Sequence, residues 1–449
     1  MKELTEFAGK NVLVLGLAKS GYAAANLLSS MGANVVVNDA SPEEGNEEAA
    51  LLKERGIPVI CGGHPNDILD WGFELVVKNP GIPYHNEVVK NAILKKIPVW
   101  TEVELASRIS EAPIIAITGS NGKTTTTTLL FHMLNIGGKK PLIAGNIGTV
   151  ACTVAEKAEP DQLIVMEVSS FQLAGTEQFR PKIAIWTNLY DAHLDYHGTS
   201  ESYALSKANV TMNQTAEDFF IYNADQPEIE QYAEQTAAQK IPFSLKGRTA
   251  YGISADDHMI YWQGEPFVSR SIIKLVGAHN LENVLAATAA AILVDCDKTA
   301  IENVLGSFTS VRHRMQFVKE LKRRSFYNDS KATNTLATKS ALSSFQTPVL
   351  LIAGGLDRGH SFEELAPYME HVKAVIAIGE TAERFAEFAH SCGIDDVTQV
   401  QSMGDAVAVA YEKSEEGDTI LLSPACASWD QYKSFEQRGD AFIDEVMKL

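Results

Sequence analysis

The sequence predicts an α/β protein of three domains, each built on an open and mostly parallel sheet. Three observations support this prediction. Short apolar runs rich in Val, Ile and Leu alternate with amphipathic helical stretches from one end of the chain to the other. Glycine turns directly follow several of these apolar runs. The length of 449 residues corresponds to two to four domains at roughly 100 to 200 residues each.

The first domain is expected over residues 1–110. Residues 11–39 predict a buried strand, a glycine turn, an amphipathic helix and a second strand that ends at Asp39, which together make a βαβ unit. The alternation continues through apolar runs at 74–83 and 97–100 to a hinge-like segment at 107–113. This pattern favours a Rossmann-like N-terminal domain.

Two more α/β domains are expected, over residues 111–310 and 311–449. The central segment begins with the strand "IIAIT" at 114–118 and closes with an alanine-rich helix at 280–294. After residues 306–317 the strands restart, and we expect a C-terminal Rossmann-like domain. Parallel sheets bind ligands beyond the carboxyl ends of their strands, so three such sheets predict substrates held between domains.

The composition excludes several classes of protein. A net charge of −19 argues against a nucleic-acid partner, because phosphate backbones are held by clustered Lys and Arg. The five cysteines are scattered without a CxxC pair, which indicates neither a disulfide framework nor a zinc site. No apolar stretch approaches the roughly 18 residues that would span a membrane. We expect a cytoplasmic protein with no membrane partner.

The stretch "IIAITGSNGKTTTTTLL" at 114–130 predicts a phosphate-binding loop, although Ile117 stands where the longer P-loop pattern has its first glycine. The turn Gly119-Ser120-Asn121-Gly122 joins a buried strand to a helix, so backbone N–H groups and a helix N-terminus surround one point. Lys123 would neutralise the outer phosphates, and Thr124 would offer its hydroxyl to Mg²⁺. The alternative is a simple glycine turn.

A second glycine turn, "GLAKSG" at 16–21, is more ambiguous. Gly16 and Gly21 fit a dinucleotide fingerprint, but Ala18 takes the place of its second glycine. Asp39 either accepts a hydrogen bond from a ribose or base, or caps a turn. A nucleotide other than a classical NAD is the better interpretation.

Several polar residues follow strands elsewhere in the chain. Glu167 ends a buried strand, where a carboxylate is costly unless it is paired or binds a metal; the alternative is a cap of the next turn. His193 also lies after a strand and is preferred to His197, although a lone histidine more often packs than ligates. Asp329 and Lys331 follow a third-domain strand, either as site residues or as a helix cap and a solvated lysine.

With these motifs together, the chain resembles the Mur ligase family along essentially its whole length. The family-wide strings are "TGSNGKT" at 118–124, "HNLENVLAA" at 279–287 and "HR" at 313–314. The strings "VSSFQL" at 168–173, "NDSKATN" at 328–334 and "LSPACASWDQYKSFEQRG" at 422–439 are similar to those of the member that adds D-glutamate. The alternatives are a related Mur ligase and a folylpolyglutamate synthase-like amide ligase that adds another amino acid.

The resemblance implies an ADP-forming ligase of cytoplasmic peptidoglycan precursor synthesis. Its substrates would be ATP, D-glutamate and UDP-N-acetylmuramoyl-L-alanine, with two Mg²⁺ ions as cofactors. ATP would phosphorylate the alanyl carboxylate, and the amine of D-glutamate would attack the acyl phosphate. We expect a monomer.

The resemblance also implies roles for individual residues. The implied catalytic residues are Lys123, His193, Lys207 and Arg314. The implied ATP contacts are Gly119, Ser120, Asn121, Gly122, Lys123, Thr124, Thr125, Asn283, Arg314 and Asp329. The implied metal ligands are Thr124 and Glu167 for one ion, and His193 and a carbamylated Lys207 for the other. Without the resemblance, Lys207 would be interpreted as an exposed helix lysine.

The remaining implied contacts concern the two other substrates. The uridine substrate would contact Ser20, Asp39, Asn79, Gly81 and, at its muramoyl part, Asn146. D-Glutamate would contact Lys331, Thr333, Arg358, Ser428 and Phe435. Arg358 departs from the family pattern, because some members carry lysine there against the side-chain carboxylate of D-glutamate, and arginine would pair with different geometry.

Overall fold

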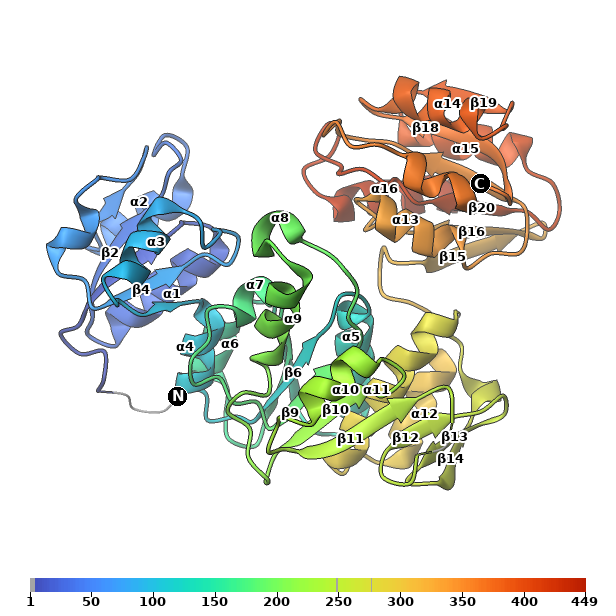
Figure 1. Ribbon diagram of the computed structural model, residues 1–449. Helices are drawn as coiled ribbons and strands as arrows, with labels where there is room; N and C mark the ends of the chain where they lie inside the picture. The colour runs from blue at the N-terminus through green and yellow to red at the C-terminus, as the bar shows by residue number, and fades with distance from the viewer. Residues whose placement is uncertain (1–4, 248, 276) are drawn as a thin grey trace. The chain divides into compact units, whose positions relative to one another are not determined.

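The computed structural model describes residues 5–247, 249–275 and 277–449, in which the strands form three sheets (Figure 1). The α/β class predicted from the sequence is therefore confirmed. By its contacts the chain divides into two compact units. The first unit contains the chain up to Ile273 together with Ala278–Ser307, and the second contains Lys274–Gly277 and Phe308–Leu449.

The first sheet is parallel throughout and has the strand order β3-β2-β1-β4-β5. Its strands are β1 (Asn11–Leu15), β2 (Asn34–Asn38), β3 (Val59–Ile60), β4 (Leu75–Lys78) and β5 (Val99–Trp100). The helices of this part are α1 (Lys19–Ser30), α2 (Glu47–Glu54), η1 (Ile68–Trp71), α3 (Glu87–Leu94) and α4 (Glu102–Ile109). From β1 the chain adds β2 and β3 on one side of the sheet and then β4 and β5 on the other. Doubly wound sheets bind their ligands at this switch point, between β1 and β4.

Glycine is required at the turn between β1 and α1. A Cβ on Gly21, in the first turn of α1, would lie 1.9 Å from the carbonyl oxygen of Gly16. Gly16 itself has φ +92°, and its Cβ would meet the side chain of Asn79 at 2.8 Å. The two outer glycines therefore let the helix and the β4 turn approach the end of β1 closely.

The second sheet has nine strands in the order β14-β13-β12-β11-β10-β9-β6-β8-β7. The strands from β6 to β9 are β6 (Ile114–Thr118), β7 (Pro141–Gly145), β8 (Leu163–Glu167) and β9 (Ile183–Trp186). The others are β10 (Phe219–Asn223), β11 (Gln239–Ser244), β12 (Ile253–Ala255), β13 (Met259–Trp262) and β14 (Glu265–Ser269). The pairs from β7 to β12 are parallel, as expected, whereas β12, β13 and β14 form an antiparallel edge.

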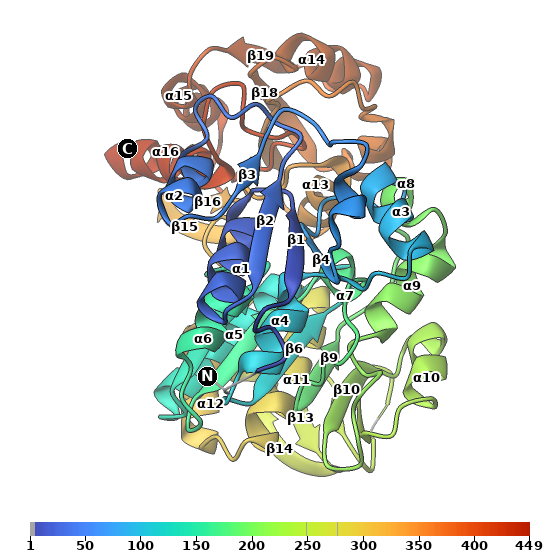
Figure 2. The same ribbon diagram turned by 90° about the vertical axis from the view of Figure 1, so that its left-hand side faces the viewer.

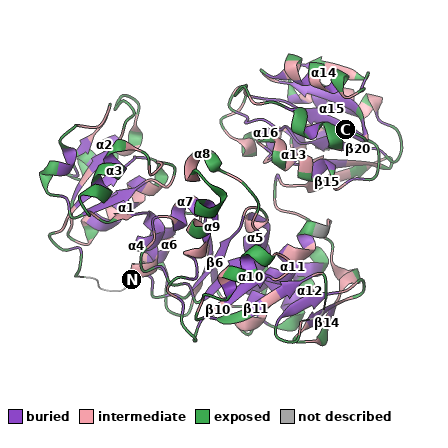
Figure 3. Ribbon diagram, viewed as in Figure 1, coloured by how far each residue is buried: buried purple, intermediate pink, exposed green. Residues whose placement is uncertain are grey.

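Helices flank this sheet in the sequence and in space (Figures 1 and 2). They are α5 (Lys123–Ile136), α6 (Ala151–Lys157), α7 (Ser170–Leu173), α8 (Leu194–His197), α9 (Ser200–Ala208), α10 (Pro227–Ala233), η2 (Arg270–Ile272), α11 (Ala278–Leu293) and α12 (Lys298–Ser307). The central strands of the sheet, β6, β8, β9 and β10, are buried along most of their length, as the colouring of Figure 3 shows.

The segment 107–113, expected to be a hinge, begins inside a helix. Its first residues complete helix α4, whose last residue Ile109 is fully buried, and Ser110 is buried too. Thr101 donates from its backbone to the carbonyl of Gly175 at 2.9 Å, and the buried Glu104 accepts hydrogen bonds from the backbone of residues 177 and 178. The first polar residues of this segment therefore belong to the packed end of a helix. The first two sheets lie in one compact unit.

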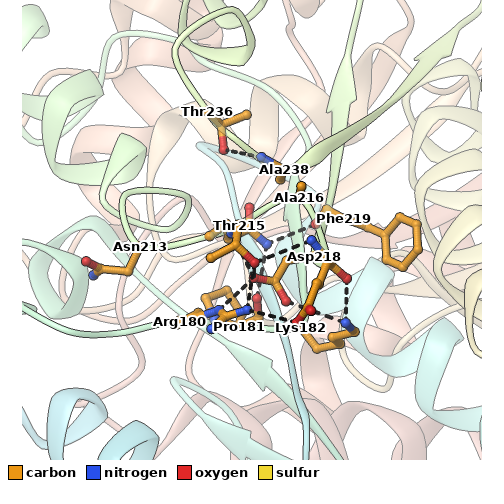
Figure 4. A network of polar contacts seen from close by, with 12 residues as sticks. Arg180, Pro181, Lys182, Asn213, Thr215, Ala216, Asp218, Phe219, Thr236 and Ala238 are labelled. Atoms are coloured by element: carbon orange, nitrogen blue, oxygen red, sulfur yellow. Dashed lines mark hydrogen bonds and ion pairs between the residues drawn. The ribbon is translucent and has the colours of Figure 1, made fainter.

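A polar network fixes the entry to two neighbouring strands of the second sheet (Figure 4). Arg180, just before β9, donates to Asp218 at 2.7 Å and to Thr215 at 2.7 Å, both just before β10. Burial alone would raise the pKa of Asp218, but the Arg180 guanidinium and the Thr215 N–H hold it below its ordinary value. The network lies at the amino ends of the strands, opposite the edge where ligands bind, so it is structural.

The third sheet forms the second unit, with strand order β15-β16-β20-β17-β18-β19. Its strands are β15 (Gln316–Leu321), β16 (Arg324–Asn328), β17 (Val349–Ala353), β18 (Val372–Ile378), β19 (Val397–Val400) and β20 (Thr419–Leu422). Its helices are α13 (Thr335–Leu342), η3 (Glu363–Tyr368), α14 (Ala382–Ser391), α15 (Met403–Lys413) and α16 (Phe435–Lys448). Only β15 is antiparallel to its neighbour.

Two apolar clusters pack against this third sheet, one containing Phe362 and Phe385 and the other Phe442 and Val446. The second unit therefore has its own hydrophobic core. No helix in the described ranges is long and apolar enough to cross a membrane.

Candidate functional site

Three neighbouring strands of the second sheet bring the predicted phosphate and metal residues together at their carboxyl ends. Strand β6 lies between β8 and β9, and its last residues pair with the last residues of both: Ile117 with Glu167, and Thr118 with Trp186. The loop after β6 carries the glycine turn, and the loop after β9 leads to His193. Glu167 is the last residue of β8. Parallel pairing thus converts residues far apart in sequence into neighbours.

The glycine turn is shaped by two residues in contact with it. Gly119 has φ +148°, and a Cβ there would meet Thr187 Oγ1 at 2.0 Å. Gly122 has φ +79°, and its Cβ would meet Asn283 Oδ1 at 2.1 Å. The structure therefore places Asn283, a predicted ATP contact on α11, directly against the turn. Only glycine leaves the backbone this open to a neighbour or a ligand.

Helix α5 begins at Lys123, immediately after the turn. A helix N-terminus favours an anion, and that of α5 opens directly from the glycine turn. The Lys123 ammonium folds back to donate to the carbonyls of Gly119 at 2.8 Å and Ser120 at 2.9 Å. Thr124 and Thr125 follow it and are both buried. The predicted phosphate residues are thus gathered in one place.

The middle of the turn is held by residues that the sequence analysis missed. Ser120 Oγ donates to the carbonyl of Tyr190 and accepts from the hydroxyl of Tyr203 at 3.0 Å. The N–H of Asn121 donates to the side chain of Asn188 at 2.8 Å. These partners come from the β9 loop and helix α9, and no local signal in the sequence marks them.

Glu167 has the environment that a metal-binding carboxylate requires. It is 2% exposed, and its Oε1 accepts a hydrogen bond from Asn146 Nδ2 at 2.8 Å. Its Oε2 is buried and finds no hydrogen-bond partner among the described residues. A buried carboxylate oxygen without a partner is costly, and a cation would satisfy it. The donor types at Glu167 and Thr124, carboxylate and hydroxyl oxygen, suit Mg²⁺.

Asn146 lies at Glu167 and not beside the other predicted uridine contacts. It follows β7, whose last residue Gly145 pairs with Glu167. Its backbone N–H also donates to the Glu167 carbonyl at 2.9 Å. The structure therefore joins Asn146 to Glu167, one of the predicted metal ligands, at the carboxyl ends of strands β7 and β8.

Lys207 is buried, so its interpretation as an exposed helix lysine is wrong. Its side chain is only 1% exposed, and Nζ donates to the carbonyl of Gly119 at 2.8 Å. Burial lowers the pKa of Lys207 well below its ordinary value, and the nearby Lys123 ammonium lowers it further, while Glu167 acts in the opposite direction. Carbamylation uses the neutral amine, and a lowered pKa is a shift toward that form, so the environment fits the carbamylation that the resemblance implies.

His193 begins helix α8 in a left-handed conformation, with φ +56°. Its ring packs edge-on against Phe171, with 4.9 Å between centroids, and lies 6.2 Å from the ring of Tyr203. Lys207 Nζ lies over the ring of Tyr203, 4.6 Å from its centroid. Tyr203 thus links the two residues predicted to share a metal ion.

An unmodified metal site is not preformed there. In the part of the chain that the structure describes, no group of three or more His, Cys, Asp and Glu side chains is arranged to hold a metal ion. The predicted sets depend instead on the hydroxyl of Thr124, on a modified Lys207 and on the oxygens of substrates.

In the first sheet, three of the predicted uridine contacts form one network. Asn79, directly after β4, donates to Ser20 Oγ at 2.9 Å and accepts from the N–H of Gly81 at 3.0 Å. Asp39, after β2, accepts from the N–H groups of Leu17 at 2.6 Å and Ser41 at 2.7 Å. Burial would raise the pKa of Asp39, but these hydrogen bonds lower it overall, so the carboxylate is charged at the sheet edge.

In the second unit, Asp329 is a buried carboxyl at the end of β16. It accepts from Met315 N–H at 3.1 Å and from Ser423 Oγ at 2.9 Å. Burial raises its pKa to about 7, although these hydrogen bonds and the nearby Arg314 oppose the shift. Arg314 and Asp329 are thus neighbours, as predicted ATP contacts would be, but they belong to the second unit and the phosphate turn belongs to the first.

The predicted D-glutamate contacts lie on the loops after β16, β17 and β20. Lys331 Nζ lies 5.6 Å from the ring centroid of Phe435, at the start of α16. Arg358 stacks over the exposed ring of Trp429 at 4.9 Å, and Trp429 directly follows the buried Ser428. Thr333 lies in the loop between β16 and α13. These five residues are therefore carried by neighbouring strand ends of one sheet.

Arg438 of α16 is a further residue that the sequence analysis missed. It is 2% exposed and donates to the carbonyls of Ser330 at 2.9 Å and Cys426 at 3.0 Å. It therefore joins the loop after β16 to the loop after β20, between the predicted contacts Lys331 and Ser428. The string "EQRG" contained this residue, but nothing in its spacing indicated burial.

Comparison with known families matches most of the chain in three segments. The N-terminal domain described as Mur ligase MurD-like matches residues 10–101, the Mur ligase middle domain matches 117–291, and the Mur ligase glutamate ligase domain matches 313–426.

Curated relatives match the chain from end to end. The chain is 55% identical to UDP-N-acetylmuramoylalanine–D-glutamate ligase of Geobacillus kaustophilus strain HTA426, with 100% of both chains covered. It is 56% identical to the protein of that name from Geobacillus sp. strain WCH70 and 54% identical to that from Bacillus mycoides strain KBAB4, again over 100% of each chain.

Solved structures share the fold at low identity. UDP-N-acetylmuramate-alanine ligase MurC from Thermotoga maritima superposes with a TM-score of 0.60 at 18% identity, covering 98% of this chain and 99% of the other. MurF ligase from Thermotoga maritima in complex with ADP gives a TM-score of 0.57 at 15% identity, with 99% and 96% covered. The identity to the curated relatives is far above the level at which family membership is in question, and the chain belongs to the Mur ligase family.

Proposed function

We propose that this protein is an ATP-dependent ligase that joins D-glutamate to UDP-N-acetylmuramoyl-L-alanine and releases ADP and phosphate. The observation that carries the proposal is the 53–56% identity, along the whole chain, to curated ligases named for that reaction. We further propose that residues 1–110 bind the uridine nucleotide, residues 111–310 bind ATP and residues 311–449 bind the amino acid. The reaction belongs to cytoplasmic peptidoglycan precursor synthesis.

In the first step, an oxygen of the alanyl carboxylate attacks the γ-phosphorus of ATP, and ADP leaves. Lys123 would exchange its present hydrogen bonds to the carbonyls of Gly119 and Ser120 for the outer phosphates. Arg314 would close onto the transferred phosphoryl group. The turn and the N-terminus of α5 would hold the rest of the phosphate chain.

Mg²⁺, when bound, supplies neutralisation of the negative charge that gathers on the phosphate oxygens. Thr124 and Glu167 would hold one ion, which satisfies the buried Glu167 oxygen without a partner among the described residues. His193 and a carbamylated Lys207 would hold the second. The lowered pKa of Lys207 supports this modification.

In the second step, the amine of D-glutamate attacks the acyl carbon, and inorganic phosphate leaves. Lys331, Thr333, Arg358, Ser428 and Phe435 would orient D-glutamate. Its two carboxylates need cations and hydroxyl donors, and Lys331, Arg358 and Ser428 are groups of those types.

The test is phosphate release from ATP in the presence of UDP-N-acetylmuramoyl-L-alanine and a panel of amino acids. We expect release with D-glutamate and little release with L-glutamate, D-alanine or L-lysine. Omitting the uridine substrate should abolish release, which separates a ligase from an ATPase. Equal activity with L-lysine would contradict the proposal and favour a related ligase.

A further inference from the structure

Lys78 is a fully buried lysine for which the proposed chemistry has no role. It is the last residue of β4 in the first sheet and is 1% exposed. Its ammonium donates to the carbonyls of Pro80 at 3.3 Å and Ile82 at 2.9 Å, both in the turn that follows β4. A buried ammonium is costly unless its N–H groups find acceptors, and these carbonyls supply two of them.

The third hydrogen bond of Lys78 crosses to the second sheet. Nζ donates to the hydroxyl of Tyr196 on helix α8 at 2.9 Å. The same hydroxyl lies 3.0 Å from the carbonyl of Pro80 and 3.1 Å from that of Ile82. Lysine, tyrosine and the two turn carbonyls therefore form one closed cluster, within the first compact unit.

This cluster is packed on both sides by aromatic rings. Lys78 Nζ lies 4.8 Å from the ring centroid of Tyr84 and 5.7 Å from that of Tyr196. The ring of Phe171 packs 4.4 Å from Tyr196 and 4.9 Å from His193, between centroids. A displacement of Tyr196 is therefore transmitted through Phe171 to His193, which begins the same helix.

A buried carboxylate balances the charge of Lys78. Glu102 is 3% exposed, accepts from Gln172 Nε2 at 2.9 Å through Oε1, and has no hydrogen-bond partner for Oε2 within the described ranges. Burial lowers the pKa of Lys78 to about 7 and raises the pKa of Glu102, while the attraction between the two opposite charges opposes both shifts. Gln172 directly follows Phe171, so the counter-charge also bears on the helix α7 that carries that ring.

We propose that Lys78 is a positioning residue that couples the turn at 79–82 to helix α8 and thereby fixes His193. This inference rests on the proposed function, in which Asn79 and Gly81 contact the uridine substrate and His193 is a metal ligand. When the substrate orders the turn, the carbonyls of Pro80 and Ile82 are held in place, and Lys78 and Tyr196 carry that order to α8. Binding of the uridine substrate then orders His193, the proposed metal ligand.

Hydrogen exchange of the peptide 189–199, followed by mass spectrometry on the full-length protein, tests this coupling. The amides of His197 and Gly198 are protected by hydrogen bonds inside this segment. Adding UDP-N-acetylmuramoyl-L-alanine without ATP should slow exchange in this peptide roughly fivefold to tenfold, the effect of a stabilised local opening. Tyr196→Phe, which keeps the ring and removes the hydroxyl, should lose most of this protection, and so should Lys78→Met.

The matched control is Lys95→Met, which removes an exposed lysine at the end of helix α3 that pairs with Asp70. It should keep the full protection of 189–199. Lys78→Met and Tyr196→Phe combined should lose no more than either alone, because both break one cluster. Undiminished protection in Tyr196→Phe, or purely additive losses, would overturn the coupling.

The experiment separates failure of the coupling from failure of the proposed function. If the uridine substrate protects the turn at 79–86 in the wild type but leaves 189–199 unchanged, the substrate assignment stands and the coupling is wrong. If the substrate protects neither segment and shows no binding by calorimetry, the proposed function fails, and the coupling fails with it.

Discussion

Lys207 is the side chain whose environment most strongly constrains the chemistry. Its amine is buried, burial lowers its pKa, and it donates to the carbonyl of Gly119, which also accepts from Lys123. We predict that Lys207→Ala lowers turnover at least about a hundredfold, because the proposed metal ligand is lost. Phosphate release measures the effect, and added short carboxylates should restore part of it.

An exposed lysine of the same compact unit provides the control for this prediction. Lys240 on β11 is exposed, and Lys240→Ala should leave turnover unchanged. Full activity of the Lys207 variant would refute the proposed role of this residue.

Lys78 should leave a signature in the pH dependence of stability. Burial lowers its pKa to about 7, against the charge of Glu102, which raises it. Between about pH 7 and pH 10 the unfolded chain holds a proton at this site that the folded chain does not. The free energy of unfolding should therefore rise with pH in that range, by at most about 1.4 kcal/mol per pH unit.

Lys78→Met removes this titration and provides the comparison. Melting temperatures at pH 7, 8 and 9 should show the wild type gaining on the variant at each step, and a constant difference below pH 7. A difference that is the same at every pH would show that the buried amine keeps its ordinary pKa.

Which single residues could be predicted depended on whether their partners were local in sequence. The glycine turn and the strand-terminal position of Glu167 followed from local patterns, and the structure has both. The burial of Lys207 could not be predicted in this way, because its partners Gly119 and Tyr203 impose it. The sequence of helix α9 by itself predicts a solvated lysine at this position. Arg438 was missed for the same reason, since its partners come from two other loops.

At the level of elements, the junction between β6 and α5 requires a residue without a Cβ at position 122. Gly122 has φ +79°, and a Cβ there would lie 2.1 Å from Asn283 Oδ1. Gly122→Ala should therefore displace Asn283 or the turn and weaken ADP binding at least about tenfold, measured by calorimetry.

The other end of the same helix offers a matched control. Gly138, just beyond α5, has a similar φ of +70° but no atom within 4 Å of its Cβ position. Gly138→Ala should cost about 1 kcal/mol of stability from backbone strain and leave ADP binding unchanged. Equal binding by both variants would contradict the proposed contact of the turn with phosphate.

Element boundaries followed the sequence where periodicity was strong and departed from it where packing decided. The strand "IIAIT" and the alanine-rich helix at 280–294 were predicted and are present as β6 and α11. The segment 107–113 looked like a hinge because it is polar, yet Ile109 and Ser110 are buried at the end of α4. The antiparallel strands β12 to β14 were not predicted, because short strands give no signal of their direction.

At the level of the whole molecule, one apolar core spans the first two sheets. The cluster that includes Val12 and Val14 of β1 continues through Trp100 and Ile109 to Trp186 of β9. The third sheet packs on separate clusters of its own. A division into two compact units therefore follows from how the cores are shared, although the chain has three sheets.

This division predicts two calorimetric unfolding transitions. The phosphate turn and Asn283 belong to the first unit, so ADP should raise the melting temperature of that transition by mass action, with about 2.7 kcal/mol of stabilisation at a hundredfold excess over Kd. The second transition should move less, because of the proposed nucleotide contacts only Arg314 and Asp329 lie there. Gly138→Ala should lower the first transition alone, which identifies it. A single transition that ADP shifts as a whole would mean that the two units unfold together, and the nucleotide would then stabilise both cores at once.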